Sequence, residues 1–149
     1  ALLAFLTYRL GDRHAAEDVM ADTFERAMRA GRRFDARRGS EKSWLYAIAV
    51  NLVRDRARRS AVEERVLRET AGALETDDSL DVAGRVSARQ SVSQAMTVLS
   101  PEEREVIALR YGGDLTVPEI ARVLDLELTT VEGRVYRALR KLRVELDER

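Results

Sequence analysis

Residue types that build crosslinks or reactive sites are absent or scarce in this sequence. It contains no cysteine, which excludes disulfide bonds and thiolate metal ligands and is compatible with a reducing compartment. Its single histidine, His14, cannot form a histidine metal cluster, and we expect neither a metal nor a cofactor. No apolar run approaches the roughly 18 to 20 residues of a membrane-spanning helix, and we expect no signal peptide before the first helical pattern. We therefore expect a cytoplasmic protein without membrane insertion.

Proline is also scarce, and both prolines stand where a helix would begin. They are Pro101 and Pro118, and elsewhere apolar residues recur at the three- and four-residue spacing that is typical of amphipathic helices. This pattern predicts an all-α fold. The chain opens at Ala1 inside such a pattern, and we expect that residues upstream of it are missing.

The charges balance overall but are segregated along the chain. There are 26 basic and 26 acidic side chains. Residues 26–59 hold eleven Arg and Lys against three Asp and Glu, whereas residues 1–25 and 60–81 lean acidic. A basic block of this density is a plausible surface for phosphates, because the release of counterions favours binding. A solvated helix face is the alternative that charge alone leaves open.

The apolar pattern predicts three helices in a first domain, which we assign to residues 1–60. The first helix ends near Gly11, the second ends near Gly31, and the third begins around Trp44 and fades by Arg59. The first two helices should pack as a hairpin. The apolar stripe of the second helix is expected to consist of Ala15, Val19, Ala21, Phe24 and Met28.

A linker and a second helical domain follow. Small and acidic residues replace the apolar stripe over residues 61–83, which we interpret as a flexible acidic linker. The second domain is expected over residues 84–149, beginning with a helix from Val86 to Leu99. The predicted fold class is therefore all-α, with two small helical domains joined by a flexible linker.

Local signals mark further helix starts in the second domain. Ser100 and Glu103 have the spacing of a capping box, and Thr116 is expected to cap another helix. Apolar side chains on this helix and on the last helix should face one another across the crossing. The expected inward positions are Ile120, Ala121, Leu124, Val131, Val135 and Leu139.

Residues 115–142 have the layout of a helix-turn-helix, a short helix followed by a brief turn and a longer helix with a basic face. We expect Thr129 or Thr130 to cap the longer helix, whose N-terminal turn would enter the major groove. The candidates for base-edge contacts are Thr129, Thr130, Glu132 and Gly133, and those for phosphate contacts are Arg134, Arg137, Arg140 and Lys141. An ordinary helical hairpin with a solvated arginine face is the alternative.

The motifs resemble one known family along nearly the whole chain. Residues 16–27 read AEDVMADTFERA, residues 43–52 read SWLYAIAVNL, and residues 99–106 read LSPEEREV just before the helix-turn-helix. In this order they are similar to the extracytoplasmic-function (ECF) sigma factors of bacterial RNA polymerase. The resemblance implies a domain like sigma region 2 at the N-terminus and a domain like sigma region 4 at the C-terminus.

The first motif resembles the helix with which sigma factors dock on core RNA polymerase. The resemblance assigns this role to Glu17, Asp18, Asp22 and Arg26. The three carboxylates recur at helical spacing, so they form one acidic face that can meet a basic partner. Compensation of the helix dipole is an equally natural role for Glu17 and Asp18.

The second motif and the loop before it resemble the part of sigma that reads the melted minus-ten strand. The resemblance assigns this contact to Arg37, Arg38, Lys42, Asn51, Arg54, Asp55 and Arg58. The Asn51 amide can bond to a base edge, although a lone helical Asn usually faces solvent. Trp44 is expected in the core. Glu41 stands at a position where many relatives carry an aromatic or apolar residue.

The helix-turn-helix resembles the sigma unit that binds the minus-thirty-five element. Glu132 stands where relatives commonly carry a basic residue, and Thr129 stands where Gly is usual. Glu can accept from the cytosine amino group or repel phosphates, so the preferred sequence cannot be copied from relatives. By resemblance we also expect an anti-sigma factor as a partner.

The predicted function is a sigma factor that binds bacterial core RNA polymerase and promoter DNA. No nucleophile and base pair, Gly-rich phosphate loop or metal motif is present, so we do not expect an enzyme. An ordinary helix-turn-helix regulator would explain residues 115–142 but not the first domain. The third possibility is a helical protein-interaction module whose arginine faces are simply solvated. DNA binding that is absent or insensitive to salt would favour this possibility.

Overall fold

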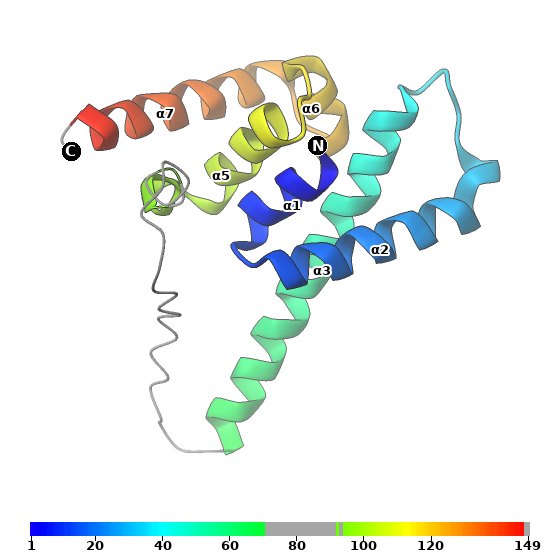
Figure 1. The fold of residues 1–149 in the computed structure, drawn as a ribbon, viewed down its shortest axis with the longest axis horizontal. Coiled ribbons are helices and arrows are strands. Elements are labelled where there is room, and N and C mark those ends of the chain that lie inside the picture. The colour runs from blue at the N-terminus through cyan, green and yellow to red at the C-terminus, as the bar shows by residue number, and fades with distance from the viewer. Residues whose placement is uncertain (71–91, 93, 148–149) are drawn as a thin grey trace.

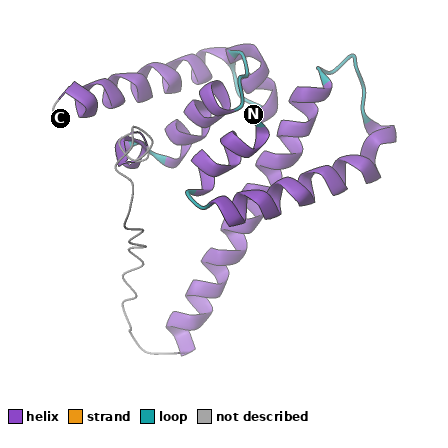
Figure 2. Cartoon of the chain, in the orientation of Figure 1, coloured by secondary structure: helices purple, strands orange, loops and turns teal. Residues whose placement is uncertain are grey.

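The structure is helical throughout the part of the chain that it describes. This computed structural model describes residues 1–70, 92 and 94–147. Within those ranges there is no strand, as Figure 2 shows. The predicted all-α class is therefore confirmed.

The first two helices form the expected hairpin (Figure 1). Helix α1 (Leu2–Leu10) ends at Gly11, whose left-handed backbone (φ 72°) lets its N–H donate to the Thr7 carbonyl oxygen at 2.8 Å. Helix α2 (Arg13–Ala30) begins directly afterwards, because the Asp12 carboxylate accepts from the His14 backbone N–H at 3.0 Å. A 3-10 turn, η1 (Gly31–Arg33), continues α2.

The inner face of α2 differs from the predicted stripe. Ala21, Phe24 and Met28 are exposed, so their expected place in the core is wrong. Val19 is buried as predicted, and Ala16 and Thr23 take the other buried positions. Thr23 tolerates full burial because its hydroxyl donates to the Val19 carbonyl oxygen one turn earlier, at 2.6 Å. These small side chains allow α1 and α3 to approach α2 closely.

Helix α3 (Glu41–Thr70) is longer than the sequence predicts. The predicted linker is wrong over residues 61–70, which continue the helix and project from the other helices (Figure 1). The large apolar side chains of this segment, Val62, Val66 and Leu67, are exposed. Ion pairs between Arg68 and Glu64 (3.4 Å) and between Arg65 and Glu69 (3.8 Å) support it. The rest of the predicted linker, residues 71–83, lies outside the described residues.

The described part of the second domain begins with α-helical residues at positions 92, 94 and 95, which lead into a 3-10 turn, η2 (Met96–Val98). Most of the helix predicted from Val86 lies outside the described residues. It continues with α5 (Pro101–Ile107), a π-helical turn η3 (Ala108–Gly112), α6 (Val117–Leu124) and α7 (Leu128–Asp147). The capping box at Ser100 and the cap at Thr116 are confirmed. Because α7 begins at Leu128, Thr129 and Thr130 lie inside its first turn, and the prediction that either caps it is wrong.

Helices α6 and α7 cross with a short turn between them, as a helix-turn-helix requires. Asp125 ends α6 in a left-handed conformation (φ 53°) and turns the chain toward α7. Four of the expected inward residues, Ile120, Ala121, Leu124 and Val131, are buried, and Val135 is half-buried. Leu139 is exposed, so its predicted burial is wrong, and Ala138 takes the inner position because a small side chain fits the close crossing with α5.

The two domains pack against each other around one continuous core. Helix α1 lies against the turn η3, and the first half of α3 lies against α6 (Figure 1). The largest fully buried side chains come from both domains and include Phe5, Leu6, Val50, Leu109 and Leu115. The expected domains are therefore docked in this structure.

Candidate nucleic-acid interface

The N-terminal turns of α7 carry the candidates for base contacts. Thr129, Thr130 and Glu132 are exposed there, and Gly133 follows them half-buried. A Cβ at Gly133 would lie 3.3 Å from Nη1 of Arg137, so the guanidinium packs over the glycine. A larger residue at position 133 would displace this cation.

The phosphate candidates extend along the same helix. Arg137 and Arg140 are exposed, whereas Arg134 is half-buried. Arg137 and Arg140, with Lys141 and Val144, border a shallow cavity of about 560 Å³ between α7 and the start of α5. The structure thus brings the predicted base and phosphate candidates onto one helix.

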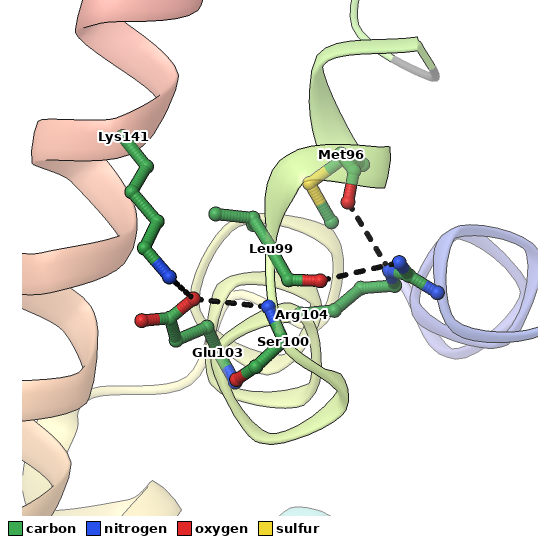
Figure 3. A network of polar contacts seen from close by, with 6 residues as sticks. All are labelled: Met96, Leu99, Ser100, Glu103, Arg104 and Lys141. Carbon is green, nitrogen blue, oxygen red and sulfur yellow. Dashed lines mark hydrogen bonds and ion pairs between the residues drawn. The ribbon is translucent and has the colours of Figure 1, made fainter.

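Lys141 differs from its neighbours because an intramolecular carboxylate already holds it (Figure 3). Its Nζ donates to Oε2 of Glu103 at 2.8 Å, and the same oxygen accepts from the Ser100 backbone N–H at 3.0 Å. The hydrogen bond from Lys141 is the main cause that lowers the pKa of Glu103, and burial opposes it. The position of Lys141 therefore depends on the start of α5.

The loop before α3 forms the second cluster of candidates. Arg37 and Arg38 are exposed, and the Arg37 backbone N–H donates to the Asp35 carboxylate at 3.0 Å. Phe34 and Trp44 pack as a tilted pair with ring centroids 5.5 Å apart. Trp44 is half-buried beside the loop, so its expected place in the core is wrong.

A cavity of about 420 Å³ opens between this loop and the second domain. Loop residues and Trp44 line one side, and Arg122, Val123 and Asp125 of the second domain line the other. The sequence did not point to these three residues, because nothing local links them to a loop far upstream. In this structure the second domain thus walls a cavity at the predicted minus-ten surface.

The exposed face of α3 carries the next candidates. Asn51 is exposed, and Asp55 forms an ion pair with Arg58 one turn later. The hydrogen bond from Arg58, aided by the charges of Arg26 and Arg59, lowers the pKa of Asp55. Asp55 therefore organises a cluster of arginines that spans α2 and α3.

Two other minus-ten candidates are tied to the second domain. Nη2 of Arg54 donates to Oε2 of Glu105 at 3.1 Å, and Nζ of Lys42 donates to the Asp114 carbonyl oxygen at 2.7 Å. Sequence reasoning missed Glu105 and Asp114. Glu105 directly follows Glu102, Glu103 and Arg104 in the sequence, so nothing local marked it as the buried carboxylate that needs a cationic partner.

The acidic face of α2 lies on the outside of the first domain. Glu17, Asp18 and Asp22 are all exposed, and Glu17 accepts from Arg13 at 3.0 Å. Asp22 and Arg26 border a charged cavity of about 280 Å³ between α2 and α3. Arg26 therefore lies close to the arginines around Asp55 on α3, as well as to the carboxylates of the acidic face of α2.

The described residues contain no group of three or more His, Asp or Glu side chains placed to hold a metal ion. None of the described helices is long and apolar enough to span a membrane.

Comparisons with known proteins place both domains in one family. Residues 1–62 match Sigma-70 region 2, and residues 89–142 match Sigma-70, region 4. Among curated proteins, the chain is 32% identical to the ECF RNA polymerase sigma factor SigW of Bacillus subtilis, over 95% of this chain and 81% of SigW. It is also 32% identical to SigK of Mycobacterium tuberculosis, over 93% of this chain and 75% of SigK.

Solved structures share the fold. CnrH in complex with the cytosolic domain of CnrY matches with a TM-score of 0.69 and 31% identity, over 99% of this chain and 81% of CnrH. The sigma factor RpoE in complex with the anti-sigma factor NepR from Bartonella quintana matches with a TM-score of 0.78 and 24% identity, over 98% of this chain and 89% of RpoE.

The fold and the exposed basic helix define a two-domain, helix-turn-helix type of DNA-binding protein. With regions 2 and 4 both present and SigW covered over most of its length, the chain belongs to the ECF RNA polymerase sigma factors. It is a sigma factor that directs promoter recognition. A helix-turn-helix regulator and a protein-interaction module both leave the region 2 match unexplained, and neither reading is retained.

Proposed function

We propose that this sigma factor divides its work among three surfaces. The acidic face of α2 binds core RNA polymerase, the loop before α3 together with α3 binds the melted minus-ten strand, and α7 binds the minus-thirty-five duplex. The observation that carries the proposal is the segregation of charge: carboxylates face outward on α2, and arginines face outward on α7.

For core polymerase the contact residues are Glu17, Asp18 and Asp22, with Arg26 at the edge of the face. Exposed carboxylates on one helix face steer a basic partner surface into register. The exposed side chains of Phe24 and Met28 on the same helix supply apolar area that such an interface can bury. Their exposure, which contradicted the predicted core, thus supports a docking role.

For the minus-ten strand the contacts fall into two kinds. Arg37, Arg38 and Arg58 are placed to hold the sugar-phosphate backbone, which contributes affinity without sequence information. Asn51 is exposed and supplies an amide that can bond to a base edge. The ring of Trp44 on α3 packs against the ring of Phe34 in the loop, and this contact holds the loop against the helix.

For the minus-thirty-five element the first turns of α7 enter the major groove. Thr129, Thr130 and Glu132 are exposed and face base edges, while Arg134, Arg137 and Arg140 bind phosphates. Glu132 favours cytosine at the position it meets, because its carboxylate accepts from the exocyclic amine.

The protein acts in the cytoplasm and performs no covalent chemistry of its own. Its relatives are sigma factors, which are not enzymes. RpoE and CnrH were each solved with a bound partner, NepR and CnrY, and NepR is an anti-sigma factor. We extend this to the present chain and propose that an anti-sigma factor holds it inactive.

Run-off transcription with purified bacterial core polymerase tests the proposal directly. A library of randomised promoters is transcribed at fixed salt with and without the protein. Specific starts that require the protein, together with two enriched sequence elements, are the expected result. Absence of such starts, with duplex DNA still bound, would contradict the assignment of the three surfaces.

A further inference from the structure

We propose that the cavity between α1 and the start of the second domain is a binding site for a small organic phosphate, a monoester whose carbon body is apolar or aromatic. The residues that line this cavity belong to none of the three surfaces assigned above. Binding there does not depend on the promoter function, and it can be measured without DNA or polymerase.

The cavity has a size that suits a small ligand. Its volume is about 550 Å³, and small-molecule sites commonly measure roughly 300 to 1,000 Å³. Helix α1 and the turn that follows it line one side, and Met96, Thr97 and Arg104 line the other. Segments far apart in the sequence thus converge on one space.

The charged side chains at the cavity are arginines. Arg9, Arg13 and Arg104 line it, and no Asp or Glu of the described residues does. Arg13 is exposed, and Glu17 at 3.0 Å already meets its charge at the surface. Arg9 and Arg104 are half-buried, so these two cations decide what the cavity binds.

Arg9 lacks a full partner for its charge. Its side chain is 19% exposed, and its buried Nε has no hydrogen-bond partner among the residues that the structure describes. Oε1 of Glu105 lies 3.9 Å from this Nε, too far for a hydrogen bond. Oε2 of Glu105 accepts from Arg54 at 3.1 Å, so one carboxylate faces two guanidinium groups. Because a buried cation is unfavourable unless it is paired, this cluster favours a further anion.

Arg104 is held by backbone carbonyl groups rather than by a carboxylate. Its Nε donates to the Met96 carbonyl oxygen and its Nη2 donates to the Leu99 carbonyl oxygen, both at 3.3 Å (Figure 3). Both bonds are long, and they use two of the five N–H donors of the guanidinium group. Within the described ranges no ion pair neutralises Arg104. Its remaining donors and its charge are therefore available to a ligand.

Two uncompensated arginines beside apolar surface favour an organic phosphate. A phosphate monoester carries a charge of about −1.5 to −2 at neutral pH and has three acceptor oxygens, which match the paired N–H donors of arginine. Leu3, Leu10 and Met96 supply apolar surface in the same cavity, and the side chain of Tyr8 there is 43% exposed. An apolar or aromatic body covers this surface, and inorganic phosphate does not.

Isothermal titration calorimetry of the full chain with phenyl phosphate tests the site, at fixed ionic strength and in a buffer free of phosphate. We expect saturable binding with a Kd below about 1 mM, and roughly ten-fold weaker binding of inorganic phosphate, which lacks the ring. Arg9→Gln should weaken the binding of phenyl phosphate roughly ten-fold or more, because a charge-assisted contact is lost. Arg32→Gln is the matched control, since it removes the same charge at an exposed position outside the cavity and should leave the Kd unchanged.

A second pair of variants leaves the half-buried arginines in place. Ala4 is exposed in the first turn of α1 and lines the cavity. Ala4→Glu puts a carboxylate there, which the positive end of the helix dipole tolerates, and Ala4→Gln is its uncharged counterpart. Ala4→Glu should bind phenyl phosphate roughly ten-fold more weakly than Ala4→Gln, because like charges repel. Circular dichroism confirms that each variant remains folded.

Saturable binding that weakens in both Arg9→Gln and Ala4→Glu supports a phosphate site in this cavity. A parent chain that shows no saturable binding below about 1 mM overturns it. A Kd that neither variant changes also overturns it. Arg137→Ala locates the alternative, because a Kd that changes in this variant but not in Arg9→Gln would place the phosphate on α7 and refute the cavity as its site.

Discussion

Replacing Glu103 with alanine should lower the stability of the second domain by a predictable amount. The Glu103 carboxylate closes the capping box of α5 by accepting from the Ser100 N–H, and it accepts from Lys141 on α7 (Figure 3). One side chain therefore joins the start of α5 to the last helix. The Ala variant loses both contacts at once.

The two contacts contribute similar amounts. Loss of a reciprocal cap costs about 1 kcal/mol of unfolding free energy. The ion pair adds about 1 kcal/mol, because the Lys141 side chain is 48% exposed and regains water when its partner is removed. The sum of about 2 kcal/mol corresponds to a fall in Tm of roughly 4 to 8 °C for a chain of this length.

The same carboxylate makes the stability depend on pH. The pKa of Glu103 is lowered from its ordinary value of 4.5, mainly by the hydrogen bond from Lys141. A group whose pKa is lower in the folded state contributes stability above its unfolded pKa, and this contribution is lost as the pH falls through the folded pKa. Stability should therefore fall below about pH 4.5 in the parent, and less steeply in Glu103→Ala.

Thermal unfolding followed by circular dichroism, repeated between neutral and acid pH, measures both effects. Glu63→Ala, at an exposed position of α3, is the control and should change Tm by no more than about 1 °C. A Tm for Glu103→Ala within that margin of the parent at neutral pH would refute the role assigned to the capping box and the ion pair.

Three further predictions concern two of the proposed surfaces and one buried side chain. Asp18→Arg should weaken binding to core polymerase roughly ten-fold, as measured by fluorescence anisotropy, because it places a like charge against a basic partner; binding to isolated promoter DNA should be unchanged, and a loss in both assays would contradict the prediction. Arg137→Ala should do the reverse and reduce the slope of log affinity against log salt by about 0.9, since one phosphate contact is lost; an unchanged slope would remove Arg137 from the interface. Tyr46→Phe should leave stability at pH 7 unchanged or raise it by up to about 1 kcal/mol, because the buried Tyr46 hydroxyl has no hydrogen-bond partner among the residues that the structure describes. Burial, aided by the charge of Asp114, raises the pKa of Tyr46 from 10.0 to about 12. The parent should therefore lose stability as the pH rises between those values, and Tyr46→Phe should not show this loss. Chemical denaturation across this pH range measures the difference, with Tyr136→Phe, at an exposed position, as the control; equal losses in the parent and in Tyr46→Phe would contradict the prediction.

Local signals in the sequence predicted the elements that local interactions determine. The capping boxes at Ser100 and Thr116 each involve residues three apart, so their geometry depends on nothing distant. Gly11 ended α1 as predicted for the same reason. The family resemblance then supplied the order of the two domains, which periodicity alone does not give.

Predictions failed where packing between distant segments decides the outcome. Phe24 is apolar and helical, but the close approach of neighbouring helices admits only small residues such as Thr23 on the inner face. The extension of α3 over residues 61–70 was missed because charge pairs, rather than an apolar stripe, sustain it. The bond between Arg54 and Glu105 joins residues 51 positions apart, and no sequence pattern specifies it.

The extension of α3 beyond the first domain has a mechanical consequence. Residues 61–70 of this helix form a rigid arm of about 15 Å, at 1.5 Å per residue. A rotation of roughly 10° at the base of such an arm moves its tip by about 3 Å. Under the proposed binding of the melted strand by α3, a small change in the seating of this helix is therefore magnified at Thr70.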